Sequence, residues 1–132
     1  MPVVIDGTNG VTTPDIEINS GSFGYVTGSG GTVTQETSKS TSVTLNKPTG
    51  QITMNNAALA ANTTVTFTIT NSVIGSGDLL VLNHISGGTA GSYTLNAQSS
   101  SGSATINVRN VTAGSLSEAI IIGFAVIKST TS

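Results

Sequence analysis

The single histidine, His84, is the residue whose chemistry is easiest to imagine. Strand alternation places it on one face with Leu80 and Leu82, and Asp78 falls on that face as well if the strand stays regular. A serine from elsewhere in the chain could then complete a Ser-His-Asp set, but such a triad is recognised by its geometry. The chain has no Gly-x-Ser-x-Gly elbow. We therefore interpret His84 as a hydrogen-bonded residue at a strand end, buried or in an interface, and we expect no enzyme.

The acidic residues are scattered and give weak support for a metal site. Asp15 and Glu17 would lie on one side of a strand and could supply two of the six to eight oxygens that Ca²⁺ takes. Such a pair is more typical of a solvated face or of an ion pair between subunits. The glycine-rich turn at 28–31 lacks the Gly-Lys-Ser/Thr ending of a phosphate-binding loop. We predict no metal and no cofactor.

The aromatic residues leave open a second kind of site. Phe23, Tyr25 and Tyr93 could form a platform on which a sugar stacks, although isolated aromatic side chains are more typical of a core and the chain has no tryptophan. Arg109 falls on the polar face of its predicted strand, where a surface or subunit ion pair is expected. A glycan-binding module therefore stays as an alternative.

Charge and composition exclude several classes of partner. The 132 residues carry a net charge of −2 and only 8% are charged, so there is no basic patch for nucleic acid. The absence of cysteine excludes disulfides and thiolate metal sites. The longest apolar run, residues 119–127, is far short of the ~20 residues of a membrane-spanning helix. With no signal sequence at its start, we expect a soluble, leaderless protein without a membrane partner.

The pattern of β-branched and turn residues predicts an all-β protein. In the stretch 63–70, Val65, Phe67 and Ile69 alternate with threonines, which is typical of a strand with one buried face. Similar runs recur about every 8–12 residues between turns rich in Gly, Asn and Ser. We predict an antiparallel β-sandwich over residues 21–132, jelly-roll-like, with about eight strands. Only residues 55–61 favour a helix, and they are too few to sustain one alone.

Residues 1–20 differ from the rest and predict an extended N-terminal arm. The turn dipeptides Asp6-Gly7 and Asn9-Gly10 separate short apolar stretches, and Pro14 interrupts any regular element. An arm with so little local structure buries little by itself. We therefore hypothesise that a partner subunit orders it.

The most apolar stretch runs from Glu118 to Lys128 and predicts a strand that is covered on both faces. Alternation alone leaves open which face is the core. We assign Ile120, Ile122, Phe124 and Val126 to the core because this set includes the aromatic ring. The other face, smaller around Gly123, is then the predicted subunit contact.

Several motifs resemble a β domain found in virion proteins of tailed bacteriophages and prophages. They cover most of residues 23–128, and they are the segments 30–54, 81–84, 86–91, 106–110 and 116–119. The opening residues 3–10 look like the start of small phage structural and tail-fibre proteins. The resemblance implies an accessory virion role, often as a trimer, and supplies no catalytic residues.

Together these observations predict a structural virion protein, a capsid decoration or cement protein that stabilises the head shell. Its expected partners are further copies of itself, as a homotrimer, and the major capsid protein or another virion protein. It would be made in the host cytoplasm and lie on the outer surface of the phage head, or alternatively on the tail. The alternative function is a receptor- or glycan-binding module of a tail fibre or head fibre. The predicted assembly contacts are Val3, Val4, Ile5, Ile16, Ile18, Ile121, Ala125 and Ile127.

Overall fold

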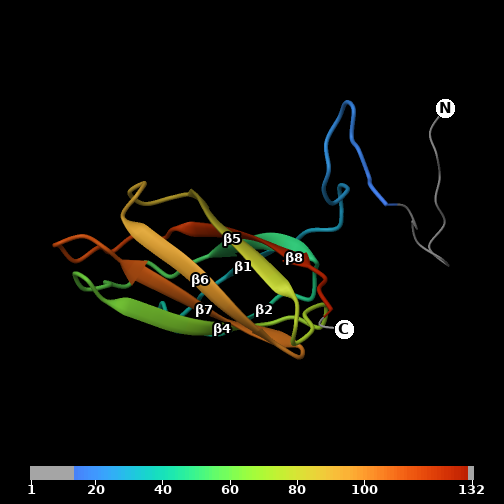
Figure 1. Ribbon diagram of the computed structural model, residues 1–132. Coiled ribbons are helices and arrows are strands. Elements are labelled where there is room, and N and C mark those ends of the chain that lie inside the picture. Colours follow the sequence, from blue (N-terminus) through green and yellow to red (C-terminus); the bar gives the residue numbers. More distant parts are fainter. Residues whose placement is uncertain (1–13, 131–132) are drawn as a thin grey trace.

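The computed structural model describes residues 14–130, which contain eight strands in two facing sheets and no helix (Figure 1). The strands are β1 (Thr32–Thr34), β2 (Val43–Thr44), β3 (Thr49–Thr53), β4 (Thr64–Thr70), β5 (Leu79–Ser86), β6 (Tyr93–Ser100), β7 (Ser103–Asn110) and β8 (Ile121–Ile127). Sheet A has the order β1-β3-β8-β5 and sheet B the order β2-β4-β7-β6. The prediction of an all-β, sandwich-like fold is confirmed.

Both sheets are mixed, which corrects the prediction that all strands pair antiparallel. β1 pairs with β3, and β2 with β4, in parallel. The reason lies in the path of the chain, which alternates between the sheets from β1 to β4. Two strands that neighbour each other in one sheet are thus separated by a strand of the other sheet, and they run in the same direction. The pairs formed by β7 and β8 are antiparallel, as predicted.

The core lies between the sheets and follows the alternation in the sequence. Phe67 and Ile69 of β4 and Ile106 of β7 are buried, whereas Thr64 and Thr66 of β4 face outward. Each apolar side chain of this size that leaves water contributes about 1.5–3 kcal/mol. The core face assigned to the last strand is confirmed, since the following side chains are at most 3% exposed: Ile120, Ile122, Phe124 and Val126.

Buried polar side chains fasten the loops to the sandwich. The side-chain amide of Asn110, which is fully buried, donates to the carbonyl oxygens of Leu59, Ala60 and Gly114, at 3.0, 3.2 and 2.8 Å. Its amide oxygen accepts from the backbone and hydroxyl of Thr112. Throughout residues 14–130, no buried side-chain nitrogen or oxygen lacks a hydrogen-bond partner. The body is therefore internally satisfied.

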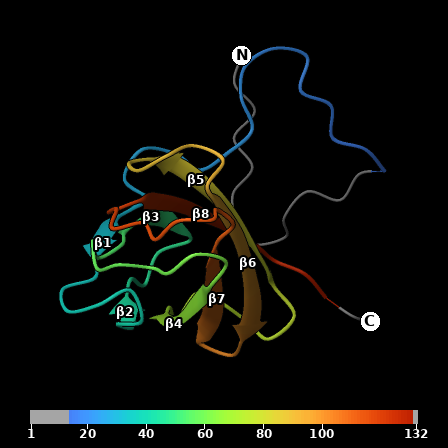
Figure 2. The same cartoon turned by 90° about the vertical axis from the view of Figure 1, so that its left-hand side faces the viewer.

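The arm, which we define as residues 14–31, forms no strand and projects away from the two sheets (Figures 1 and 2). The first strand begins only at Thr32, so no strand marks the predicted boundary at residue 20. The predicted contacts Val3, Val4 and Ile5 lie outside the described residues.

Candidate functional site

Sheet A exposes an apolar surface on the side that faces away from the core. β5 and β8 pair there with Leu79 opposite Ile127 and Val81 opposite Ala125. Leu79 is 58% exposed and Ile127 is 50% exposed. We call this surface the outer face, and it consists of Leu79, Val81, Ile85, Ile121, Ala125 and Ile127. Antiparallel sheets normally carry polar residues on a solvated side, so this surface is unusual.

A depression of about 510 Å³ lies in the outer face. Its lining includes Val81 and Ile85 of β5, Gly123 and Ala125 of the neighbouring β8, and Gln51 of β3, which adds a polar amide. Gly123 matters because a Cβ there would lie 2.7 Å from Cδ1 of Ile85. The missing side chain lets Ile85 lie over β8. The depression is also lined by Gly30, Gly31, Thr32, Thr49, Gly50, Asn83 and Phe124.

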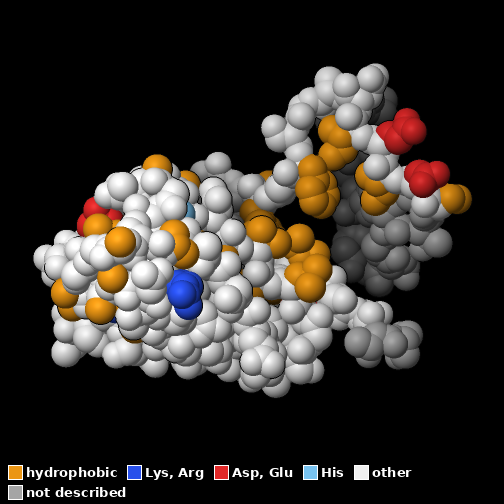
Figure 3. Space-filling model, turned by 60° about the vertical axis from the view of Figure 1, so that its left-hand side comes forward, with side chains coloured by type: hydrophobic (Ala, Val, Ile, Leu, Met, Phe, Trp, Pro, Cys, Tyr) orange, Lys and Arg blue, Asp and Glu red, His pale blue; other side chains and the backbone are white. Residues whose placement is uncertain are grey.

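The arm is apolar as well, and its apolar side chains are uncovered. Phe23 is 89% exposed and Ile16 is 68% exposed. Apart from Val111, every exposed large hydrophobic side chain of the described chain lies either in the arm or on the outer face. In Figure 3, hydrophobic side chains of the arm overhang hydrophobic side chains at the adjoining end of the body.

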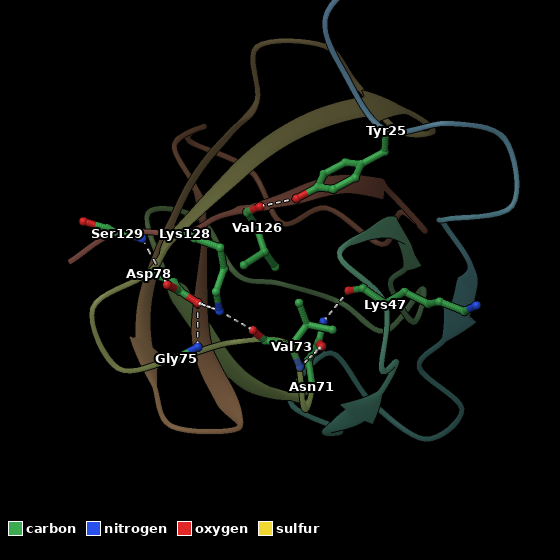
Figure 4. Close-up of polar contacts among 9 residues, drawn as sticks. All are labelled: Tyr25, Lys47, Asn71, Val73, Gly75, Asp78, Val126, Lys128 and Ser129. Carbon is green, nitrogen blue, oxygen red and sulfur yellow. Dashed lines mark hydrogen bonds and ion pairs between the residues drawn. The ribbon is translucent and has the colours of Figure 1, made fainter. Parts of the chain in front are cut away.

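Hydrogen bonds tie the base of the arm to the body, and one of them runs from the backbone nitrogen of Gln51 to the carbonyl oxygen of Gly31 at 2.9 Å. The hydroxyl of Tyr25 donates to the carbonyl oxygen of Val126 in β8 (Figure 4). Beyond this anchor the chain turns at Gly21, whose φ is +103° and around whose missing Cβ nothing lies within 4 Å. The segment that carries Ile16 and Ile18 is thus attached to the body through an unobstructed glycine.

The outer side of sheet B is polar and provides a contrast within the same chain. Thr66 donates to the amide oxygen of Asn107 at 2.6 Å, and Asn107 donates to Asn96 at 2.7 Å, so one hydrogen-bonded row crosses three strands. Arg109 is exposed on the same side. Where this chain meets water across a whole sheet, it therefore uses hydroxyl and amide groups.

Two carboxylates, Asp78 and Glu118, form hydrogen bonds near the two ends of β8. Asp78 accepts from Nζ of Lys128 at 2.5 Å and from the backbone nitrogens of Gly75 and Ser129, at 2.6 and 3.2 Å (Figure 4). The hydrogen bond from Lys128 is the main reason why the pKa of Asp78 is lowered. The partners of Asp78 are therefore Lys128, Gly75 and Ser129 near the end of β8, and His84 is not among them.

At the start of β8 a second carboxylate plays the same part. Glu118 accepts from the backbone and hydroxyl of Thr89, at 3.0 and 2.6 Å, and from the Tyr93 hydroxyl at 2.8 Å. The hydroxyl of Thr89 contributes most to lowering the pKa of Glu118, whereas burial raises the pKa of Tyr93. Lys39 is buried, and its Nζ donates to the backbone carbonyl oxygens of Asn55 and Glu118. Burial lowers the pKa of Lys39.

His84 lies at the end of β5 and is structural in its contacts. Its Nε2 is 2.7 Å from the carbonyl oxygen of Gly87, and its ring meets Tyr93 edge to face at 5.8 Å between centroids. The predicted hydrogen bond of His84 near a strand end is confirmed, whereas the side chain is half-buried and not fully buried. Nothing in these contacts assembles a nucleophile, a base and an acid.

The other predicted sites do not come together. Tyr93 is buried in the body while Phe23 and Tyr25 lie on the arm, so the three rings form no common platform. Within residues 14–130 no three His, Asp or Glu side chains are grouped to hold a metal ion. The same residues include no helix with the length and hydrophobicity needed to span a bilayer.

The predicted assembly contacts that are described fall on the two apolar surfaces. Ile16 and Ile18 are exposed on the arm, and Ile121, Ala125 and Ile127 lie on the outer face. Leu79, Val81 and Ile85 were missed, although their stretch is also apolar on both faces and carries the same signal. Phe23 and Val26 were missed because a short apolar stretch beside a turn resembles a strand.

Comparisons with protein-family models, with curated proteins and with solved structures found no match for the chain.

Proposed function

We propose that this protein is a structural virion protein of a tailed phage, and that it decorates the capsid and stabilises the head shell by subunit contacts. The observation that carries the proposal is the pair of uncovered apolar surfaces, the arm and the outer face, on a body that is otherwise satisfied. Contiguous exposed apolar surface on a small protein marks an interaction site. The virion setting rests on the resemblance of segments such as 30–54 to phage β domains.

The chemistry of the remaining residues supports a role in contact rather than in catalysis. The carboxylates Asp78 and Glu118 and the amine of Lys39 each hold backbone or side-chain groups of the fold. The low content of charged residues also favours tight protein contacts, because few charges lose their hydration when surfaces meet. Four side chains of the outer face are about half exposed, so their further burial would contribute about 0.7–1.5 kcal/mol each, or several kcal/mol together.

Electron cryomicroscopy of particles from the phage that encodes this chain tests the proposal directly. We expect density of this sandwich on the outer surface of the head, at the contacts between capsid subunits. A variant that lacks residues 1–18 should fold, because residues 14–18 add no strand to either sheet, and it should no longer occupy the head. Full occupancy by the truncated chain would show that the arm is not the attachment.

The polar side of sheet B favours one alternative, a receptor- or glycan-binding module. Its row of Thr66, Asn107 and Asn96 presents hydroxyl and amide groups beside the exposed Arg109, and such groups bind sugar hydroxyls. A glycan array probed with the full chain separates the two functions. Binding that is lost in Asn96→Ala and Arg109→Ala would favour the alternative, together with density at a fibre tip.

A further inference from the structure

We propose that the outer face of one copy is covered by the arm of a second copy, so that the chain assembles by exchanging arms. The inference rests on the proposed function and names its first partner, which is another copy of this chain. It accounts for both uncovered surfaces at once. A chain that exposes an apolar segment and an apolar face of matching form needs no other protein to bury them.

The arm and the outer face match in spacing. Ile16 and Ile18 are two residues apart, so in an arm that lies extended on a neighbouring copy both side chains project to the same side, about 6.8 Å apart. Leu79 and Val81 repeat this spacing along β5, and both point outward. An extended arm laid on the outer face therefore sets apolar side chains against apolar side chains, while its acidic residues point the other way.

The arm is long enough to reach a neighbour. Tyr25 is tied to its own body, and the nine residues from there to Ile16 extend about 30 Å at about 3.3 Å each. A body of about 100 residues has a radius of gyration of about 13 Å and so is about 35 Å across. The distal arm thus reaches well onto a copy that touches the first.

The arm leaves apolar side chains of its own outer face uncovered. If the arm covered its own outer face, Ile16 and Leu79 would be buried, whereas they are 68% and 58% exposed. The arm leads away from the sheets (Figure 2). Residues 14–130 of its own chain therefore leave the outer face open to a second copy.

The first experiment measures the mass of the full chain in solution by light scattering, without any capsid. We expect an oligomer whose association is weakened about 100-fold or more in an arm variant, Ile16→Ser with Ile18→Ser, and in a face variant, Leu79→Ser with Ile127→Ser. The substituted side chains are exposed, so both variants should keep the circular dichroism of the parent. The matched control is Val111→Ser, which removes an exposed apolar side chain outside both surfaces.

Mixing the two variants then tests whether the contact is an exchange. The arm variant retains an intact face and the face variant an intact arm, so the mixture should form a one-to-one dimer that neither forms alone. A chain that stays monomeric at the highest concentration that remains in solution overturns the proposal. So do variants that keep the parent's association, or a mixture that stays unpaired.

A disulfide identifies the residues in contact, and the cysteine-free chain gives a clean background. One chain carries Ile18→Cys, and another, lengthened by a tag, carries Val81→Cys. Oxidation of the mixture should give a mixed dimer in excess over that from Ile18→Cys with Thr66→Cys, which places the second cysteine on sheet B. Equal yields of the two mixed dimers contradict the exchange. A tight oligomer that fails to bind heads would overturn the proposed function alone, and a monomer that decorates heads would overturn only the exchange.

Discussion

Asn110 shows how much of this fold depends on single polar side chains. It lies at the end of β7 and satisfies backbone groups of two loops that are distant in sequence, around Leu59 and Gly114. The two loops are joined by an isolated backbone bridge between Leu59 and Leu116, which is much shorter than a strand ladder. The Asn110 amide, which both donates and accepts, satisfies further backbone groups of these loops from one position.

Replacing this amide should destabilise the body more than any exposed amide would. We expect Asn110→Ala to lower the free energy of unfolding by about 2–3 kcal/mol, because several buried hydrogen bonds are lost together. Urea unfolding followed by circular dichroism measures the change. The control, Asn96→Ala, removes an amide on the exposed side of sheet B and should change the stability by less than about 0.5 kcal/mol. Equal losses in both variants would contradict this account of Asn110.

At the scale of the strands, we expect alanine substitutions at Gly50 and Gly123 to have different effects on stability. A Cβ at Gly50 would lie 2.7 Å from the carbonyl oxygen of Gly31 and 3.1 Å from the ring of Phe124, and neither the backbone nor the core can yield easily. At Gly123 the closest atom is instead the end of the Ile85 side chain, which is exposed and can rotate away.

We therefore expect Gly50→Ala to cost about 1–3 kcal/mol of stability, whereas Gly123→Ala should cost less than about 1 kcal/mol. Thermal unfolding of the two variants gives the comparison. The second variant should also move Ile85 and reduce the depression, which can be followed through the methyl resonances of Ile85. If Gly123→Ala is the more damaging of the two, the packing described for β3 and β8 is wrong.

The strands were also where the sequence was most informative. Alternation in 63–70 and 118–128 predicted the buried faces of β4 and β8, because burial on a sheet repeats every two residues. The same rule placed Ile121, Ala125 and Ile127 on the outer face. It could not predict the parallel pairs, because direction and neighbour are set by the path between the sheets. Nor could it predict Asn110, whose partners lie up to 51 residues away in the sequence.

For the whole molecule, we expect stability to depend on pH through the carboxylates Asp78 and Glu118 at the two ends of β8. Asp78 and Glu118 both have pKa values below their ordinary values of 3.8 and 4.5, because hydrogen bonds stabilise the ionised forms. A lowered pKa means that the folded state binds protons less readily than the unfolded chain. Their contribution is therefore complete above pH 4.5 and is lost as the pH falls through the folded values.

We expect the unfolding temperature to be nearly constant between pH 7 and pH 5 and to fall below the ordinary carboxyl pKa values. Calorimetry at a series of pH values across both regions measures how the unfolding temperature changes with pH. Asp78→Asn and Glu118→Gln should each lower the stability at pH 7 and flatten the fall in acid. A parent and variants with parallel curves would show that these carboxylates do not couple folding to pH.

The isolated glycine in the arm has a consequence for the geometry of an assembly. Gly21 has an open surrounding and a backbone conformation that other residues rarely adopt, and it separates the anchored base of the arm from the segment that carries Ile16 and Ile18. The distal segment can therefore contact a neighbour at more than one angle while Tyr25 stays bonded to its own body. A layer built from such copies can bend, so that one sequence covers both flat and strongly curved regions of a surface.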